Sequence, residues 1–197
     1  WGLADATLNA GGDSSGVAAQ LSGGVRAVVG NESAFAAVKT DGSVVTWGEA
    51  VHGGDSNVVA AHLSGGVQTV VGTGQAFAAV KADGSVVTWG DAVSGGDSSM
   101  VSTQLSRGVQ LVVGTYRAFA AVKVDGSVVT WGHAGSGGDS SGVAALLSGG
   151  VHTVVGNVGA FAAVKVDGSV VTWGFKDFGG DSSAVRAQLS GCAVSVY

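Results

Sequence analysis

One stretch of the sequence decides the fold, and it reads Ala34-Phe-Ala-Ala-Val-Lys-Thr-Asp-Gly-Ser-Val-Val-Thr-Trp-Gly48. It returns almost unchanged at 76–90, 118–132 and 160–174, so its phenylalanine and its tryptophan recur every 42 residues. A fixed period of this length is the signature of a repeat protein, in which each unit buries its apolar face against its neighbours. We therefore predict that the chain is one array of repeated units.

The repeated stretch itself predicts a β-hairpin. Asp-Gly between two apolar segments is typical of a two-residue turn, because such turns need positive φ angles. This places the turn at Asp41-Gly42. Phe35, Ala37 and Lys39 then share one face of the first strand, and Trp47 lies on the return strand.

The remainder of each unit predicts a turn, a short helix and a further strand. Gly-Gly-Asp-Ser opens the unit at 11–14, and an aspartate or serine beside an apolar-periodic segment is typical of a helix N-cap. The helix is expected over 14–22 and should stop at Gly23-Gly24. A strand is expected over 25–29. Each unit therefore contains about three antiparallel strands plus a short helix.

These boundaries divide the chain into six segments. Four complete units are expected, with an irregular leader before them and a partial, divergent fifth unit after them. Cys192 stands where the other units carry a glycine, and 193–197 replaces the first strand. We expect this incomplete array to belong to a longer one or to be completed by another chain. An exposed sheet edge at the strand over 25–29 or at 193–197 is expected to pair with a partner, because unpaired sheet edges recruit partners. The segments are 1–10 (irregular leader with the end of a preceding unit, Trp1-Gly2), 11–52, 53–94, 95–136, 137–178 (units 1 to 4) and 179–197 (partial unit).

Composition excludes several classes of protein. An apolar content of 46% is sufficient for a buried core, and 36 glycines that follow the 42-residue period do not make a collagen. A net charge of −5 argues against a nucleic-acid partner, because phosphate binding needs a basic face. A single cysteine cannot form an internal disulfide, and no apolar run is long enough to span a membrane. The compartment is left open.

At the hairpin the sequence resembles the RCC1-like (regulator of chromosome condensation) repeat family. The resemblance rests on Ala-x-x-x-Asp-Gly-Ser-Val-x-Thr-Trp-Gly with glycine-rich spacers, and it covers 34–48, 76–90, 118–132 and 160–174. It implies an all-β repeat protein, a β-propeller whose blades are antiparallel sheets. Here the units are shorter than the family's blades, and a helix stands in place of a fourth strand. An open β-solenoid or superhelical array is the alternative architecture.

The family's functions do not transfer with the fold. Its members serve as exchange factors, ligase scaffolds and a light receptor. An exchange factor would need an inserted wedge outside the repeat, and the sequence contains none. The light receptor's tryptophans lie in Gly-Trp-Arg motifs, whereas each tryptophan here precedes a glycine.

The recurring aromatic residues have a structural and a functional interpretation. A tryptophan in every unit could line a ligand pocket, but it more often forms a wedge between sheets with its N–H bonded to the backbone. We expect the wedge. The predicted structural core is Phe35, Trp47, Phe77, Trp89, Phe119, Trp131, Phe161 and Trp173.

The recurring charged residues raise the question of a metal. The aspartate of Gly-Gly-Asp-Ser could bind Ca²⁺, because hard cations take oxygen ligands. Its other interpretation is a turn followed by a helix cap. The hairpin aspartates are expected to be turn residues, and the hairpin lysines either solvated neighbours of the turn or covers over the tryptophan ring. The four histidines show no metal spacing. We predict no metal site, no cofactor and no catalytic residue.

Variation between the units indicates where individual recognition resides. It concentrates in two sets of loops beside the hairpins, and loops on one face of a repeat fold usually carry binding. The first set is 31–33, 73–75, 115–117 and 157–159, and the second is 49–52, 91–94, 133–136 and 175–178. Their bulky members, our candidate partner contacts, are Tyr116, Arg117, Phe175, Lys176 and Phe178.

Taken together, these patterns predict a non-enzymatic structural or protein–protein interaction module, a scaffold or assembly subunit. Its partner would be a protein or other copies or segments of a larger assembly. The alternative is a propeller that binds a ligand, either a glycan or a Ca²⁺-dependent one, where equivalent sites would act with avidity.

Overall fold

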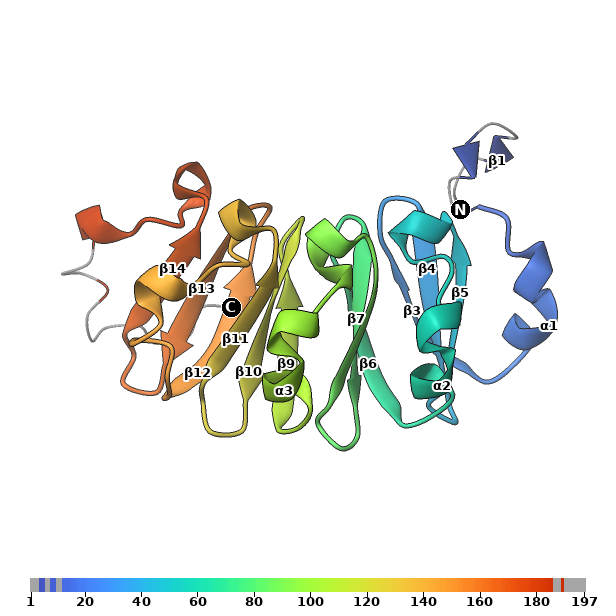
Figure 1. Cartoon of the computed structure of the whole chain (residues 1–197), viewed down its shortest axis with the longest axis horizontal. Coiled ribbons are helices and arrows are strands. Elements are labelled where there is room, and N and C mark those ends of the chain that lie inside the picture. Colours follow the sequence, from blue (N-terminus) through green and yellow to red (C-terminus); the bar gives the residue numbers. More distant parts are fainter. Residues whose placement is uncertain (1–3, 6–7, 10–11, 186–188, 190–197) are drawn as a thin grey trace.

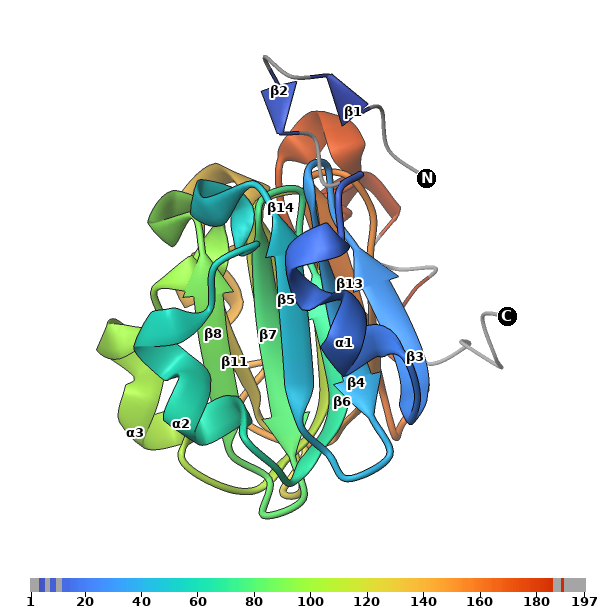
Figure 2. The same ribbon diagram turned by 90° about the vertical axis from the view of Figure 1, so that its right-hand side faces the viewer.

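The computed structural model describes residues 4–5, 8–9, 12–185 and 189. Four three-stranded antiparallel sheets follow one another in chain order along the longest axis, so that the first and the last lie at opposite ends (Figure 1). α2 (Ala60–Leu63) and α3 (Ser102–Leu105) lie beside the sheets on one side (Figure 2). Among the described residues, no helix combines the length and apolar character needed to cross a membrane.

Each sheet is built from consecutive strands, with the middle strand of the sequence also in the middle of the sheet. A separate pair, β1 (Ala4–Asp5) with β2 (Leu8–Asn9), precedes the sheets. The four sheets are β3 (Val25–Gly30), β4 (Ala34–Lys39) and β5 (Val44–Gly48); β6 (Val67–Gly72), β7 (Ala76–Lys81) and β8 (Val86–Gly90); β9 (Val109–Gly114), β10 (Ala118–Lys123) and β11 (Val128–Gly132); and β12 (Val151–Gly156), β13 (Ala160–Lys165) and β14 (Val170–Gly174).

The helix predicted over 14–22 is shorter than expected. A 3₁₀ turn is followed by a single α-helical turn, because a segment of nine residues that is followed by two glycines cannot propagate a longer helix. The fourth unit keeps only the 3₁₀ turn. The segments are η1 (Ser15–Val17) with α1 (Ala18–Leu21), η3 (Asn57–Val59) with α2 (Ala60–Leu63), η5 (Ser99–Val101) with α3 (Ser102–Leu105), and η7 (Ser141–Val143); short turns η2 (Ala50–His52), η4 (Ala92–Gly96), η6 (Ala134–Ser136), η8 (Lys176–Phe178) and η9 (Ser183–Val185) complete the set.

The hairpin turn differs from the predicted two-residue turn. Lys39 N–H donates to Ser43 O at 2.8 Å, which closes a loop of three residues, 40–42. Gly42 N–H donates back to Lys39 O at 3.0 Å, and Gly42 takes the positive φ of 79°. The Asp41 carboxylate accepts from the N–H of Ser43 at 2.9 Å. This side-chain bond favours the longer turn, which is typically a type I turn followed by one left-handed residue.

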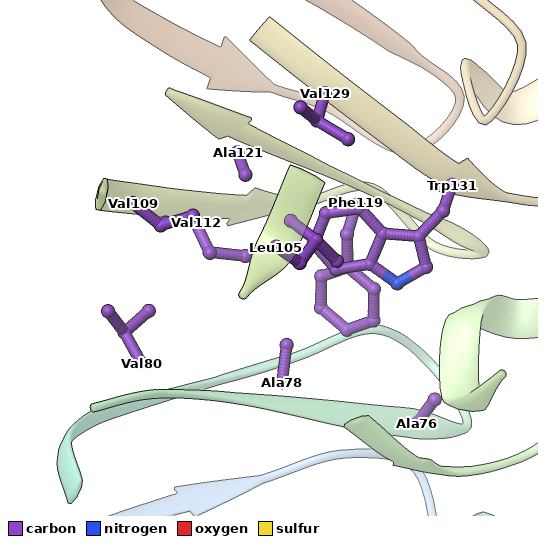
Figure 3. Packing of buried hydrophobic residues seen from close by; sticks show 10 residues of the cluster. All are labelled: Ala76, Ala78, Val80, Leu105, Val109, Val112, Phe119, Ala121, Val129 and Trp131. Carbon is purple, nitrogen blue, oxygen red and sulfur yellow. The ribbon is translucent and has the colours of Figure 1, made fainter. Parts of the chain in front are cut away.

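The core lies between the sheets and not within one layer. In the interface between the second and third sheets, Ala76, Ala78 and Val80 of β7 face Phe119 and Trp131 of the next sheet (Figure 3). Leu105 of α3 joins the same cluster. Both faces of the central strand are therefore buried, which explains why its sequence is apolar at five successive positions. The equivalent residues of the other units meet in the other two interfaces.

The first sheet shows what the interface contributes. Its outer face carries the same residue types as the later sheets, but no sheet of the described structure lies against it. Val25 is accordingly 37% exposed, whereas its equivalent Val67 is 3% exposed. Phe35 and Trp47 are only half-buried for the same reason. β3 is an edge strand of this sheet, and its expected pairing with a partner stays a prediction. The edge expected at 193–197 lies outside the described residues.

Candidate protein-interaction surface

The two sets of variable loops gather at one end of the sheets. The chain runs up β3, back along β4 and up β5, so 31–33 and 49–52 lie at the same end, while the hairpin turn lies at the other (Figure 1). We call these two ends the loop end and the turn end. All eight variable segments therefore belong to one end of the molecule.

The backbones of the first loop set are joined from unit to unit. Glu32 N–H donates to Gly74 O at 3.1 Å, Gly74 N–H to Tyr116 O at 2.8 Å, and Tyr116 N–H to Val158 O at 3.0 Å. These residues are 42 apart, so one hydrogen bond per interface ties each loop to the next. We call this series the backbone ladder. It holds the loops in line without using their side chains.

A side chain in each unit joins the two loop sets. The first residue of the first loop is always asparagine or threonine, and it donates to a carbonyl of the second loop. The pairs are Asn31 with His52 (2.7 Å), Thr73 with Ser94 (3.0 Å), Thr115 with Ser136 (3.0 Å) and Asn157 with Phe178 (2.7 Å). Sequence reasoning treated these positions as variable, but the restriction to two residue types was a signal of this role.

Tyr116 and Arg117 belong to a polar network over the first three units. The Tyr116 hydroxyl donates to Glu32 Oε1 at 2.5 Å, and Gln75 Nε2 donates to Glu32 Oε2 at 3.2 Å. Arg117 Nε lies 3.5 Å from Ser94 Oγ. The hydrogen bond to Glu32 raises the pKa of Tyr116 above its ordinary value, so the phenol stays neutral. Glu32 was missed from the sequence, because its partner is two units away.

Phe175 and Phe178 form a separate apolar pair at the fourth unit. Their rings lie 5.6 Å apart at a tilt of 48°, and each side chain is 47% exposed. They cover Gly159, where an added Cβ would lie 2.8 Å from Phe178 Cδ2. Lys176 lies in the same turn and is exposed. The five predicted contact residues thus fall into two groups, connected through the Tyr116–Val158 hydrogen bond of the backbone ladder.

The recurring tryptophans lie in the interfaces between sheets and not in a pocket. Trp131 stacks on Phe119 with ring centroids 5.2 Å apart, and its Nε1 donates to Gly95 O at 3.0 Å. Gly95 belongs to the turn η4, which connects the preceding sheet to that unit. The same bond recurs for Trp89 and Trp173 at 3.0 Å. Each indole therefore fastens its sheet to the preceding turn.

The recurring lysines do not cover the tryptophan rings. Lys123 Nζ donates to Gln104 O at 2.9 Å, at the C-terminal end of α3. Lys81 and Lys165 make the same bond to His62 O and Leu146 O, at 2.9 and 3.0 Å. A cation at a helix C-terminus satisfies an otherwise free carbonyl and opposes its partial negative charge. In the units that keep the α-helical turn, the lysine is therefore a helix-capping residue.

The aspartates of Gly-Gly-Asp-Ser bind their own backbone. Asp97 Oδ1 accepts from the N–H of Ser99, the first residue of η5, at 2.8 Å. Ser98 is the N-cap residue by position, but its Oγ bonds to Thr88 Oγ1 at 2.9 Å and does not cap the helix. The aspartate thus precedes the N-cap residue and satisfies the first helical N–H. In the described part of the chain, no three histidine, cysteine or acidic side chains lie together in a way that could hold a metal ion.

These carboxylates predict how stability depends on pH. The hydrogen bond from the Ser127 hydroxyl, followed by that from its N–H, lowers the pKa of Asp125 below the ordinary 3.8, and the hairpin aspartates of the other units behave alike. Their stabilisation is thus complete above pH 3.8 and is lost as the pH falls toward the lower folded-state pKa. We expect denaturant unfolding to show level stability near neutrality and a decline below 3.8.

A variant with alanine at the four turn serines provides the control. It should show a shallower decline, because the hydroxyl bond is the largest cause of each lowered pKa. An equally steep decline would show that other groups govern acid unfolding. The four serines are Ser43, Ser85, Ser127 and Ser169.

Comparison with known proteins identifies structures of similar fold but no relative by sequence. No protein-family model matches the sequence, and a search of curated proteins finds no match. Solved structures do resemble the chain. Human WBSCR16 is 19% identical with a TM-score of 0.53, and yeast RCC1 (Prp20), solved bound to Kap60, is 11% identical with a TM-score of 0.52. The CRINKLY WD40 ectodomain of the Arabidopsis thaliana receptor kinase ACR4 is 17% identical with a TM-score of 0.51.

These similarities confirm the predicted RCC1-like β-propeller fold. They cover 79%, 78% and 77% of this chain, in the order given, but only 48%, 44% and 53% of the other proteins. The chain thus spans about half the length of the structures it matches. At such identities the resemblance concerns architecture, and the four sheets correspond to antiparallel blades.

Proposed function

We propose that the chain is a non-enzymatic protein-interaction module that binds its partner through the loop end. The observation that carries this proposal is the separation of constant and variable residues. The sheet interfaces repeat equivalent residues, while the two sets of variable loops lie together at the loop end, where Tyr116, Phe175 and Phe178 are substantially exposed. Aromatic residues are enriched at protein interfaces because they bury large areas at little entropic cost.

The comparisons support this class of function without specifying a partner. Yeast RCC1, which shares the fold, was solved in complex with the protein Kap60. A rigid stack whose loops are fixed by backbone hydrogen bonds suits such a role, because little conformational entropy is lost on binding. The scaffold or assembly role of the module is part of the same proposal.

Site-specific photo-crosslinking tests the proposal. A photoreactive amino acid replaces Phe178 at the loop end or, as the control, the exposed Val124 in the hairpin turn of the third unit. In extract of the source cells, we expect a discrete crosslinked protein from position 178 and none from position 124. Phe175→Ala should weaken its capture about tenfold or more, since truncated anchor residues dominate binding energy. Equal crosslinking from both positions, or from neither, would contradict the proposal.

A further inference from the structure

A groove opens beside the loop end between the third unit and the turn that starts the fourth. Its volume is about 710 Å³, and its walls come from the second loop set at 91–94 and 133–136. The buried Trp131 contributes to its floor. Met100, the only methionine of the chain, lines it and is 95% exposed, and Val93 is 52% exposed.

The groove carries negative charge on two sides. Asp97 and Asp139, from successive units, both line it, and its lining contains no lysine or arginine. Each carboxylate uses Oδ1 to accept from a backbone N–H, at 2.8 Å in both cases. These backbone bonds lower the pKa of both groups, so both remain ionised at neutral pH. The bonds also hold the carboxylates in fixed orientations.

We propose that this groove binds an arginine flanked by aliphatic residues on the partner protein. Charge complementarity selects the cation, because a guanidinium forms strong, directed hydrogen bonds with carboxylates. The exposed thioether of Met100 and the side chain of Val93 provide an adaptable apolar contact for the flanking residues. The proposal rests on the proposed function, since it names the chemistry that the partner presents.

The corresponding place one unit further along explains why the site is assigned to the third unit. The aspartates equivalent to Asp97 and Asp139 are present there as Asp139 and Asp181. Gly142 occupies the position equivalent to Met100 and offers no side chain. In the second unit the equivalent residue is the shorter Val58, so the long, flexible side chain of Met100, and not the pair of aspartates, distinguishes the groove of the third unit.

The single methionine makes a direct test possible. The full chain is labelled with ¹³C at the methionine methyl group and titrated with the peptide acetyl-Gly-Leu-Arg-Leu-Gly-amide. We expect a saturable shift of the Met100 signal. The same peptide with citrulline, which is uncharged but similar in shape, should bind about tenfold more weakly or worse, because it lacks the charge that the carboxylates recognise.

Matched variants decide which carboxylates act. Asp97→Asn with Asp139→Asn keeps the Oδ1 acceptors and should weaken arginine-peptide binding about tenfold or more. Asp83→Asn with Asp125→Asn removes the same charge at the turn end and should leave binding unchanged. Absence of a saturable shift, equal binding of the citrulline peptide, or equal loss in both variants would overturn the proposal.

This test separates the groove from the proposed function. An isolated peptide reports on the groove whether or not crosslinking finds a partner protein. The crosslinking positions, 178 and 124, are not among the residues that line the groove. A failed titration together with successful crosslinking would overturn the arginine-binding proposal and leave the proposed function standing.

Discussion

Replacing Phe119 with alanine is expected to lower the free energy of unfolding by about 3–5 kcal/mol, the range for a large aromatic residue removed from a core. The ring is 0% exposed and lies between Trp131 of its own sheet and the small side chains of β7. The alanines of β7 are too small to fill the space that the ring leaves, so a cavity remains between the sheets. Urea unfolding followed by tryptophan fluorescence and circular dichroism measures the loss.

The first unit supplies the matched control for this prediction. Phe35 occupies the same position and stacks on Trp47 at 5.2 Å, but it is only half-buried because no described sheet lies against it. Phe35→Ala should therefore cost clearly less than Phe119→Ala. Equal losses would show that the stacked pair itself, and not the interface between sheets, provides the stability.

Gly126→Ala is expected to cost at least about 2 kcal/mol. Gly126 has φ of 75°, and a left-handed residue with a Cβ costs about 1–2 kcal/mol. The new Cβ would also lie 2.7 Å from the backbone nitrogen of Gly150. Relief of that contact displaces the start of β12 and weakens the hydrogen bond from Val151 N–H to Gly126 O, which adds about 0.5–1.5 kcal/mol.

Gly142→Ala is the control, since nothing lies within 4 Å of the position that its Cβ would take. It should be neutral or stabilise the protein by about 0.4–1 kcal/mol through a smaller entropy of the unfolded chain. Thermal and denaturant unfolding of both variants give the comparison. A loss for Gly142→Ala as large as that for Gly126→Ala would mean that alanine disturbs these turns for another reason.

Much of the architecture could be predicted from the period. The 42-residue recurrence of Phe35 and Trp47 identified the unit, and alternation around Asp41-Gly42 identified the hairpin. These are local signals, which depend on neighbouring residues of the same strands. The turn length was predicted wrongly. The hydrogen bond between the Asp41 carboxylate and Ser43 N–H favours the three-residue loop, and Asp-Gly is compatible with both loop lengths.

The connections between segments could not be predicted in the same way. Lys123 bonds to a carbonyl 19 residues earlier, and Tyr116 to a carboxylate 84 residues earlier. Such contacts require knowledge of which loops face one another. The direction in which the sheets stack decides this, and the stacking depends on packing of both faces of the central strand. The groove at Met100 is likewise a product of that packing.

The backbone ladder and the Asn/Thr bonds together have a consequence for how recognition can change. These contacts use main-chain atoms and one small side chain per unit, so they do not depend on the identity of the other loop side chains. Substitutions there should alter binding while the stack keeps its shape. Under the proposed function, the binding specificity of the loop end can therefore change through loop substitutions, and a new partner requires no change to the sheets beneath.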